Sequence, residues 1–291
     1  MIEKQKNSWL FQTASLKPKE NEALAMKEFR AGVLKVHSTP RMLTLETTSR
    51  CNLRCVMCPH AINAVKRPKH LDEALVSRVS RFIQQASSIQ LHGIGEPLAS
   101  PAFWPLLSFL PNQDQCESSI NTNLTLLDDK KLKNLLDSNL KVINVSLDAA
   151  TPETYRKIRG FSFEKVLENI KRLITLRQVN GKRFPLLYLN MTMMRSNIEE
   201  VPEFVKLAAS LGADCVCLWH LNRWSEEEMN RYVIERDGWV FNYRQEGLWN
   251  YPVLSNEYLR KAENTAISEG IMLYLDHNKS VYFSEAEEAH D

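Results

Sequence analysis

The chain has 291 residues, of which 44% are hydrophobic and 25% are charged, a composition typical of a globular protein rather than a disordered or fibrous one. Its formal net charge is only +2, and its short basic stretches lie in helix-like patterns, so no nucleic-acid-binding stripe is indicated. The N-terminus lacks the apolar stretch of a signal peptide, and no run of about 18 apolar residues occurs. We therefore expect a cytoplasmic protein without a membrane span.

A helix-like pattern over residues 17–34 is followed, from Met42 onward, by strands that alternate with helices. The predicted strands cover residues 43–48, 88–93, 117–122, 142–147, 185–193 and 213–219. The predicted helices cover residues 72–86, 102–110, 128–138, 163–180 and 198–210. Asp128 and either Ser196 or Asn197 are the expected N-caps of two of these helices.

This alternation predicts an α/β fold with parallel strands, right-handed crossovers and helices covering the sheet. Six strands fit a partial (β/α)6 barrel. We expect an N-terminal lead-in over residues 1–40, a barrel core over 41–220 and an aromatic-rich C-terminal extension over 221–291. The extension should contain a helix near 256–268 and a short strand at 271–275.

Residues 219–251 hold four of the six tryptophans of the chain. They are expected to pack in a core or an interface. The alternatives are that this region forms a substrate platform or lid, or that it forms a surface for a further domain.

The six cysteines are expected to be reduced thiols or metal ligands, because the chain is larger than a typical disulfide-rich secreted domain and shows no export signal. Cys215 and Cys217 lie two apart on a predicted strand and should point to the same face. These two cysteines and Cys116 are expected to be buried, inert thiols.

The other three cysteines share one short loop, TTSRCNLRCVMCPH, directly after the first predicted strand. Cys51, Cys55 and Cys58 follow a C-x3-C-x2-C spacing, and three thiolates on one loop can hold three corners of a four-iron cubane, leaving the fourth iron open to a substrate. Structural zinc is the alternative, since His60 could complete a tetrahedral set with the three thiolates.

The segment CNLRCVMCPH resembles the CxxxCxxC motif of the radical S-adenosylmethionine superfamily, in the branch that includes the SPASM-containing peptide maturases. GIGEPL, at residues 93–98, resembles the glycine-glutamate-proline motif that receives the amino group of S-adenosylmethionine. The resemblance implies that Gly93, Gly95 and Glu96 bind the cofactor. Two glycines allow a close approach of the backbone, and a carboxylate suits an ammonium group.

Two later segments continue the resemblance in order. NTNLTLL, at 121–127, is similar to the Thr-Asn-Gly-Thr segment that ends the third strand, although a leucine stands where glycine is common, and it implies a cofactor contact for Asn121. VSLDAATPETYRKIRG, at 145–160, is similar to the Ser-Leu-Asp-Gly segment. It implies that Ser146 and Asp148 meet the nucleoside and that Arg159 meets the methionyl carboxylate. Asn190 is a further candidate, for the ribose.

Some side chains have weaker indications. Met57 and His60 are candidates for contact with the adenine, or for simple packing of the loop. His92 and His220, near the ends of two predicted strands, are candidates for contact with a substrate, although buried histidines with structural partners are more common.

The resemblance implies a 4Fe-4S cluster and S-adenosylmethionine as cofactors, whose reductive cleavage gives a 5′-deoxyadenosyl radical that removes hydrogen from an organic substrate, either a peptide or a small metabolite. It also implies an electron donor of the flavodoxin or ferredoxin type. SPASM-containing members carry further cysteines, but none follows Cys217, so we expect either that this domain is absent or that the chain is truncated. A cluster-bearing scaffold without turnover of its own is the alternative function.

Overall fold

The computed structural model describes residues 16–275 and 283–284. Seven parallel strands form one sheet in the order β1-β2-β3-β4-β5-β6-β9. Their bounds are β1 Met42–Thr44, β2 Ser88–Gln90, β3 Glu117–Thr122, β4 Val142–Ser146, β5 Leu186–Met193, β6 Cys215–His220 and β9 Met272–Leu275. The predicted α/β partial barrel is confirmed, and the short strand predicted at 271–275 is β9, which joins the sheet as its seventh strand.

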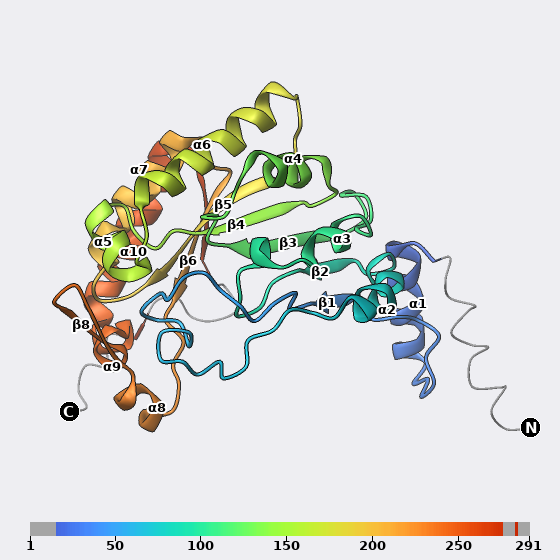
Figure 1. Ribbon diagram of the computed structural model, residues 1–291, viewed down its shortest axis with the longest axis horizontal. Coiled ribbons are helices and arrows are strands. Elements are labelled where there is room, and N and C mark those ends of the chain that lie inside the picture. The colour runs from blue at the N-terminus through green and yellow to red at the C-terminus, as the bar shows by residue number, and fades with distance from the viewer. Residues whose placement is uncertain (1–15, 276–282, 285–291) are drawn as a thin grey trace, which may run out of the picture.

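Most of the helices lie along the outer side of this curved sheet, whereas the short helices of residues 226–231 and 243–246 lie below its left end (Figure 1). Their bounds are α1 Pro18–Arg30, α2 Glu73–Ile83, α3 Phe103–Leu107, α4 Asp129–Asp137, α5 Pro152–Arg159, α6 Phe163–Val179, α7 Val201–Leu211, α8 Glu226–Arg231, α9 Tyr243–Glu246 and α10 Pro252–Glu269. No helix in the described part of the chain is long and apolar enough to cross a membrane.

The predicted cap of α4 is confirmed, whereas the predicted cap of α7 is wrong. The Asp128 carboxylate accepts a hydrogen bond from the backbone N–H of Lys131. A short 3-10 turn, Ile198–Glu200, precedes α7, and neither its N-cap Asn197 nor the α7 N-cap Glu200 makes a side-chain capping bond. Asn197 is used differently: its side-chain amide donates to the Asp148 and Thr192 carbonyls and so joins the ends of β4 and β5.

The strands separate an apolar face from a polar one, because successive side chains of a strand point to opposite sides. Ile143 and Val145 of β4 are fully buried in the main hydrophobic core. Asn144 and Ser146 alternate with them and line a cavity, as does Asn190, which is paired with Ser146 in the register of β4 and β5. The fold therefore gives the sheet a polar inner face, whose carboxyl-terminal edge is the usual place for a ligand in α/β proteins.

The segment after β6 contributes to the main sheet and also forms a second core. Strand β9 pairs with β6. Before it, strands β7 (Val233–Arg236) and β8 (Trp239–Asn242) form an antiparallel hairpin. Tyr232, Phe241 and Tyr243 pack with Val56 of the cysteine loop and with Ile158 of α5. The aromatic region thus has the packing role expected of it, and the surface it covers is the cysteine loop.

Candidate active site

The three loop cysteines line one pocket of about 220 Å³ at the carboxyl ends of the first strands. The other lining residues come from the turn after β2, the ends of β3 and β4, and α5: Met57, Gly93, Ile94, Gly95, Glu96, Asn121, Thr122, Asn123, Ser146 and Arg159. Backbone hydrogen bonds hold the loop in place, from Val56 N to Ile158 O at 2.9 Å and from Glu96 N to Arg50 O at 2.8 Å. The structure therefore brings together the cysteines and most of the cofactor-binding residues predicted from the sequence.

All three thiols are free of disulfides, and two of them receive hydrogen bonds from polar side chains. Arg159 Nη1 lies 3.4 Å from Cys55 Sγ, and Asn123 Nδ2 lies 3.9 Å from Cys51 Sγ. Burial raises the pKa of Cys51 to about 11 and also raises the pKa of Cys58. Because iron binds the thiolate, cluster binding here would be coupled to the release of these protons.

The zinc alternative finds no support in the geometry. Within residues 16–275 and 283–284, no three His, Cys, Asp or Glu side chains are arranged to hold a single metal ion. His60 is 4% exposed and does not line the cysteine pocket. Three separated thiols on one loop suit a cubane, in which each thiolate binds a different iron.

Glu96 is 2% exposed, and burial raises its pKa. Its carboxylate accepts hydrogen bonds from Thr122 Oγ1 at 2.6 Å, from Asn123 N at 2.8 Å and from Leu98 N at 3.0 Å. A carboxylate has about four acceptor positions, so capacity for a further donor remains. Glu96 therefore ties the turn after β2 to the end of β3 while it lines the pocket.

The glycines of the same turn are required by its packing on the cysteine loop. A Cβ atom on Gly95 would lie 2.2 Å from Thr48 O and 2.5 Å from Arg50 O. A Cβ atom on Gly93 would lie 2.4 Å from Cγ of the Glu46 side chain. The close approach expected of these glycines is thus made, in this structure, to the protein segment just before Cys51.

Leu124 stands where the resembled motif has glycine, and it adopts the backbone conformation that glycine favours. Its φ is 56°, in the left-handed region, and its side chain is fully buried. A left-handed residue other than glycine costs about 1 to 2 kcal/mol. The turn is therefore kept despite the substitution, with the buried leucine side chain offsetting the strain.

Asp148 and Arg159 form a buried ion pair, with side-chain exposures of 1% and 10%. Asp148 has a φ of 61° and accepts a hydrogen bond from Thr192 N at 2.6 Å. Arg159 contacts Cys55 with one terminal nitrogen, while its buried Nε has no partner among the described residues. This pair connects the end of β4 to the cysteine loop.

A polar cavity of about 420 Å³ adjoins the cysteine pocket, and the two share Asn121 and Ser146. It is lined by Gln90, His92, Ser119, Asn121, Asn144, Ser146, Asp148, Asn190, Thr192 and Trp219. The side-chain oxygen of Asn190 is buried without a hydrogen-bond partner in the described structure. Buried polar atoms are nearly always paired, so an unpaired oxygen facing a cavity fits a hydroxyl or N–H of a ligand. The residues present thus fit a cluster with a nucleoside beside it.

The residues with weaker indications in the sequence lie in different parts of the structure. Met57 lines the cysteine pocket and His92 lines the polar cavity. The His220 ring packs 4.7 Å from the ring of Phe283. The same-face prediction for Cys215 and Cys217 is confirmed, since their sulfurs lie 4.0 Å apart and both side chains are buried.

Two residues of the C-terminal extension support the cysteine loop and were missed by the sequence analysis. The Tyr232 hydroxyl donates to the carbonyl of Cys58. The Arg236 guanidinium donates to the carbonyls of Arg54, Lys157 and Ile158, so it joins the loop to the end of α5. Neither residue belongs to a motif, and only the aromatic richness of this region gave a signal.

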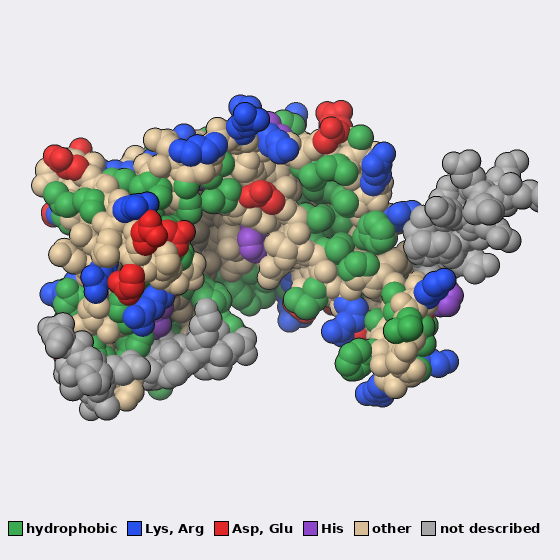
Figure 2. All heavy atoms as spheres, turned by 90° about the horizontal axis from the view of Figure 1, so that it is seen from below, with side chains coloured by type: hydrophobic (Ala, Val, Ile, Leu, Met, Phe, Trp, Pro, Cys, Tyr) green, Lys and Arg blue, Asp and Glu red, His purple; other side chains and the backbone are tan. Residues whose placement is uncertain are grey.

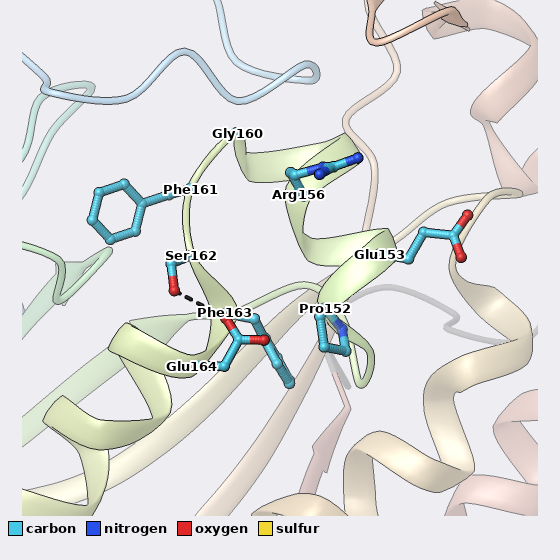
Figure 3. Close-up of a pocket in the computed structure, with 8 residues that line it drawn as sticks. All are labelled: Pro152, Glu153, Arg156, Gly160, Phe161, Ser162, Phe163 and Glu164. Atoms are coloured by element: carbon cyan, nitrogen blue, oxygen red, sulfur yellow. Dashed lines mark hydrogen bonds between the residues drawn. The ribbon is translucent and has the colours of Figure 1, made fainter.

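A second hollow, at the turn between α5 and α6, contains none of the predicted site residues. Figure 3 shows its lining, in which Phe161 and Arg156 point to opposite sides. Ser162 caps α6 by accepting from Lys165 N, and its hydroxyl also bonds to Glu164. Ser162 and Glu164 thus serve the start of the helix, while Glu153 and Arg156 pair with Lys157 and Asp237, and we assign the hollow no ligand.

The fold and the site together define an α/β protein with a three-cysteine pocket at the carboxyl ends of its parallel strands. The profile of the Radical SAM superfamily matches residues 45–208, more than half of the chain, and the chain belongs to that superfamily. It is therefore of the class of enzymes whose cofactors are a 4Fe-4S cluster and S-adenosylmethionine.

Among curated proteins, the chain is 27% identical over 199 residues to the tungsten-containing aldehyde ferredoxin oxidoreductase cofactor-modifying protein of Pyrococcus furiosus, covering 67% of this chain and 55% of that protein. It is 28% identical over 198 residues to the PqqA peptide cyclase of Gluconobacter oxydans, covering 68% and 54%. The chain thus spans about half the length of these relatives.

Among solved structures, Streptococcus suis SuiB bound to its precursor peptide SuiA matches with a TM-score of 0.63 at 14% identity, covering 88% of this chain and 52% of that one. At this identity the likeness concerns the fold.

Proposed function

We propose that this chain reductively cleaves S-adenosylmethionine and uses the product to remove a hydrogen atom from a peptide. When bound, the cluster and S-adenosylmethionine supply a 5′-deoxyadenosyl radical. The chain's own residues bind and orient the cofactor and substrate and exclude water from them. The observation that carries the proposal is the adjacency of the cysteine pocket and the polar cavity, which share Asn121 and Ser146.

Within this proposal, Cys51, Cys55 and Cys58 hold the cluster. Glu96 accepts the cofactor's amino group with its remaining acceptor capacity, beside the turn made by Gly93 and Gly95. All six of these residues line the same pocket, which supports the assignment.

Polar groups on β3, β4 and β5 hold the nucleoside in the same proposal. Asn121 and Ser146 lie between the two cavities, and Asn190 offers its unpaired oxygen to a ribose hydroxyl. Arg159 directs its free Nε to the methionyl carboxylate, while Asp148 fixes the guanidinium. The buried position of each group supports these roles, because a low-dielectric surrounding strengthens such contacts.

The lining of the polar cavity supports a peptide as substrate. The amide side chains of Gln90 on β2 and Asn144 on β4, which the nucleoside does not use in this proposal, present donors and acceptors that match peptide groups. Asp148, the one acidic side chain in the lining, is already paired with Arg159. A peptide cyclase among the relatives, and peptide-bound structures of similar fold, are consistent with this choice.

We further propose that a flavodoxin- or ferredoxin-type protein supplies the electron and that residues 41–220 form the catalytic core. The extension over 221–291 then supports the cysteine loop through Tyr232 and Arg236.

Transfer of deuterium from a peptide tests the proposal. We expect the reconstituted, dithionite-reduced protein, incubated without oxygen with S-adenosylmethionine and a pool of perdeuterated peptides, to form 5′-deoxyadenosine that carries deuterium, detected by mass spectrometry. A Cys55→Ala variant should form none. Deuterium that arises from labelled small metabolites but not from the peptides would contradict the peptide assignment, and no 5′-deoxyadenosine from a fully loaded protein would favour the scaffold alternative.

A further inference from the structure

The segment that contains the three cysteines is strongly basic. Residues 47–71 include Arg50, Arg54, Lys66, Arg67 and Lys69 but no aspartate or glutamate. At the chain's average composition, a segment of this length would contain about three acidic residues. The whole chain is therefore nearly neutral, but the segment at the cysteine loop carries a local excess of positive charge.

These five side chains are exposed and are not neutralised by neighbours. All five residues are solvent-exposed, and within the described structure none forms an ion pair with a carboxylate. Glu46 and Asp72, on either side of the segment, accept hydrogen bonds from the backbone N–H groups of Ile94 at 2.8 Å and Ala74 at 2.7 Å, and in the described structure neither forms an ion pair with the five basic side chains. Figure 2 views the molecule from below and shows more basic than acidic side chains along the upper edge of that face.

The basic segment folds back onto the approach to Cys51. Ser49 N donates to Lys69 O at 2.9 Å, and Leu71 N donates to Thr47 O at 2.9 Å. At the other end, Ala61 N donates to Cys58 O at 2.8 Å, so the exposed turn begins directly at the third cysteine. The surface formed by residues 59–69 is therefore the outer side of the cluster-binding loop.

An apolar residue lies within this basic surface. Ile62, four residues after Cys58, is 38% exposed. Weak encounters between redox proteins bury little area and depend on charge for orientation. An exposed apolar side chain that lies between basic residues along the segment fits the face of an acidic electron-transfer protein.

We propose that residues 59–69, together with Arg50 and Arg54, form the docking surface for an acidic one-electron donor protein. This inference rests on the proposed function, since only a reductive reaction needs such a donor. The electron would enter along the loop that carries the cysteines, and the donor would be oxidised by one electron for each cluster reduced. RNA and anionic lipid are the other polyanions that basic segments bind, but neither has a use at the outer side of a redox cluster.

Charge reversal separates docking from catalysis. The variant Lys66→Glu/Arg67→Glu/Lys69→Glu changes side chains only, because Lys69 anchors the loop through its backbone. A control with the same change of charge is Lys19→Glu/Lys130→Glu/Lys171→Glu, at exposed positions on α1, α4 and α6 without ion pairs in the described structure. Each protein is assayed for 5′-deoxyadenosine with dithionite and, separately, with an acidic flavodoxin kept reduced by its NADPH-dependent reductase.

We expect the loop variant to keep the wild-type rate with dithionite and to lose about tenfold or more with flavodoxin at low salt, because electrostatic steering raises association rates by about 10- to 1000-fold. The control should keep both rates. Raising the salt concentration should slow only the flavodoxin-driven reaction of the wild type.

Full flavodoxin-driven activity in the loop variant would overturn the inference. The inference would also be overturned if the loop variant kept its flavodoxin-driven rate but lost the wild-type protein's binding to RNA or to phosphatidylserine vesicles. Absence of dithionite-driven product in the wild type would instead refute the proposed function itself.

Discussion

Replacing Arg159 with methionine should lower the free energy of unfolding of the cluster-free protein by about 3 to 5 kcal/mol, because it leaves the Asp148 carboxylate buried without its partner. The measurement is urea unfolding under reducing, anaerobic conditions. The neighbouring ion pair of Arg156 with Asp237, on the same helix, provides the control. Both of its side chains are more than half exposed, so Arg156→Met should change stability by no more than about 1 kcal/mol.

The double variant Asp148→Asn/Arg159→Met distinguishes a lost charge pair from lost packing. Asparagine keeps the acceptor for Thr192 N while removing the negative charge. We therefore expect the double variant to be more stable than Arg159→Met alone. If Arg159→Met unfolds at the wild-type urea concentration, the ion pair does not connect β4 to the cysteine loop in the way described.

Replacing Gly95 with alanine should displace the cysteine loop, since the new Cβ would meet two backbone carbonyls that cannot move independently of the loop. Overpacking of this kind costs about 1 to 3 kcal/mol and occasionally more. We expect lower stability in urea and, after reconstitution, iron and sulfide contents well below the wild-type values.

Gly93→Ala is the matched control, two residues away in the same turn. Its Cβ would meet Cγ and Oε1 of Glu46, which side-chain rotation can move, and Cβ of Glu46 at 2.7 Å, which needs a small backbone shift, but no backbone carbonyl. We expect a smaller loss of stability and nearly complete cluster loading. Equal effects of the two substitutions would show that backbone contact with Thr48 and Arg50 is not what requires glycine at position 95.

Local patterns in the sequence were sufficient to predict most of the barrel. Strand β3 lies where alternation and flanking polar residues predicted it, at 117–122. The predicted cap Asp128 is also correct, because capping depends on residues within one turn. The first two strands are shorter than predicted, since their last residues belong to the cysteine loop and to the turn of Gly93 and Gly95.

Long-range contacts account for what the sequence did not reveal. Asn197 has the residue type of a cap, but its side chain is occupied by the ends of two strands. Tyr232 and Arg236 lie more than 170 residues from their partners Cys58 and Arg54, and no spacing rule connects them. The pairing of β9 with β6 likewise depends on the path of the whole extension between them.

Formation of 5′-deoxyadenosine is the most direct test of the central claim that Cys51, Cys55 and Cys58 hold a cluster that cleaves S-adenosylmethionine. The protein is reconstituted without oxygen, reduced with dithionite and compared with two variants, Cys55→Ala in the loop and Cys116→Ala at a buried cysteine outside the pocket. We predict about four irons per chain, the content of one cubane, and product from the wild type and from Cys116→Ala but not from Cys55→Ala. Product that persists in Cys55→Ala, or a wild-type protein that binds zinc without iron or sulfide, would contradict the claim.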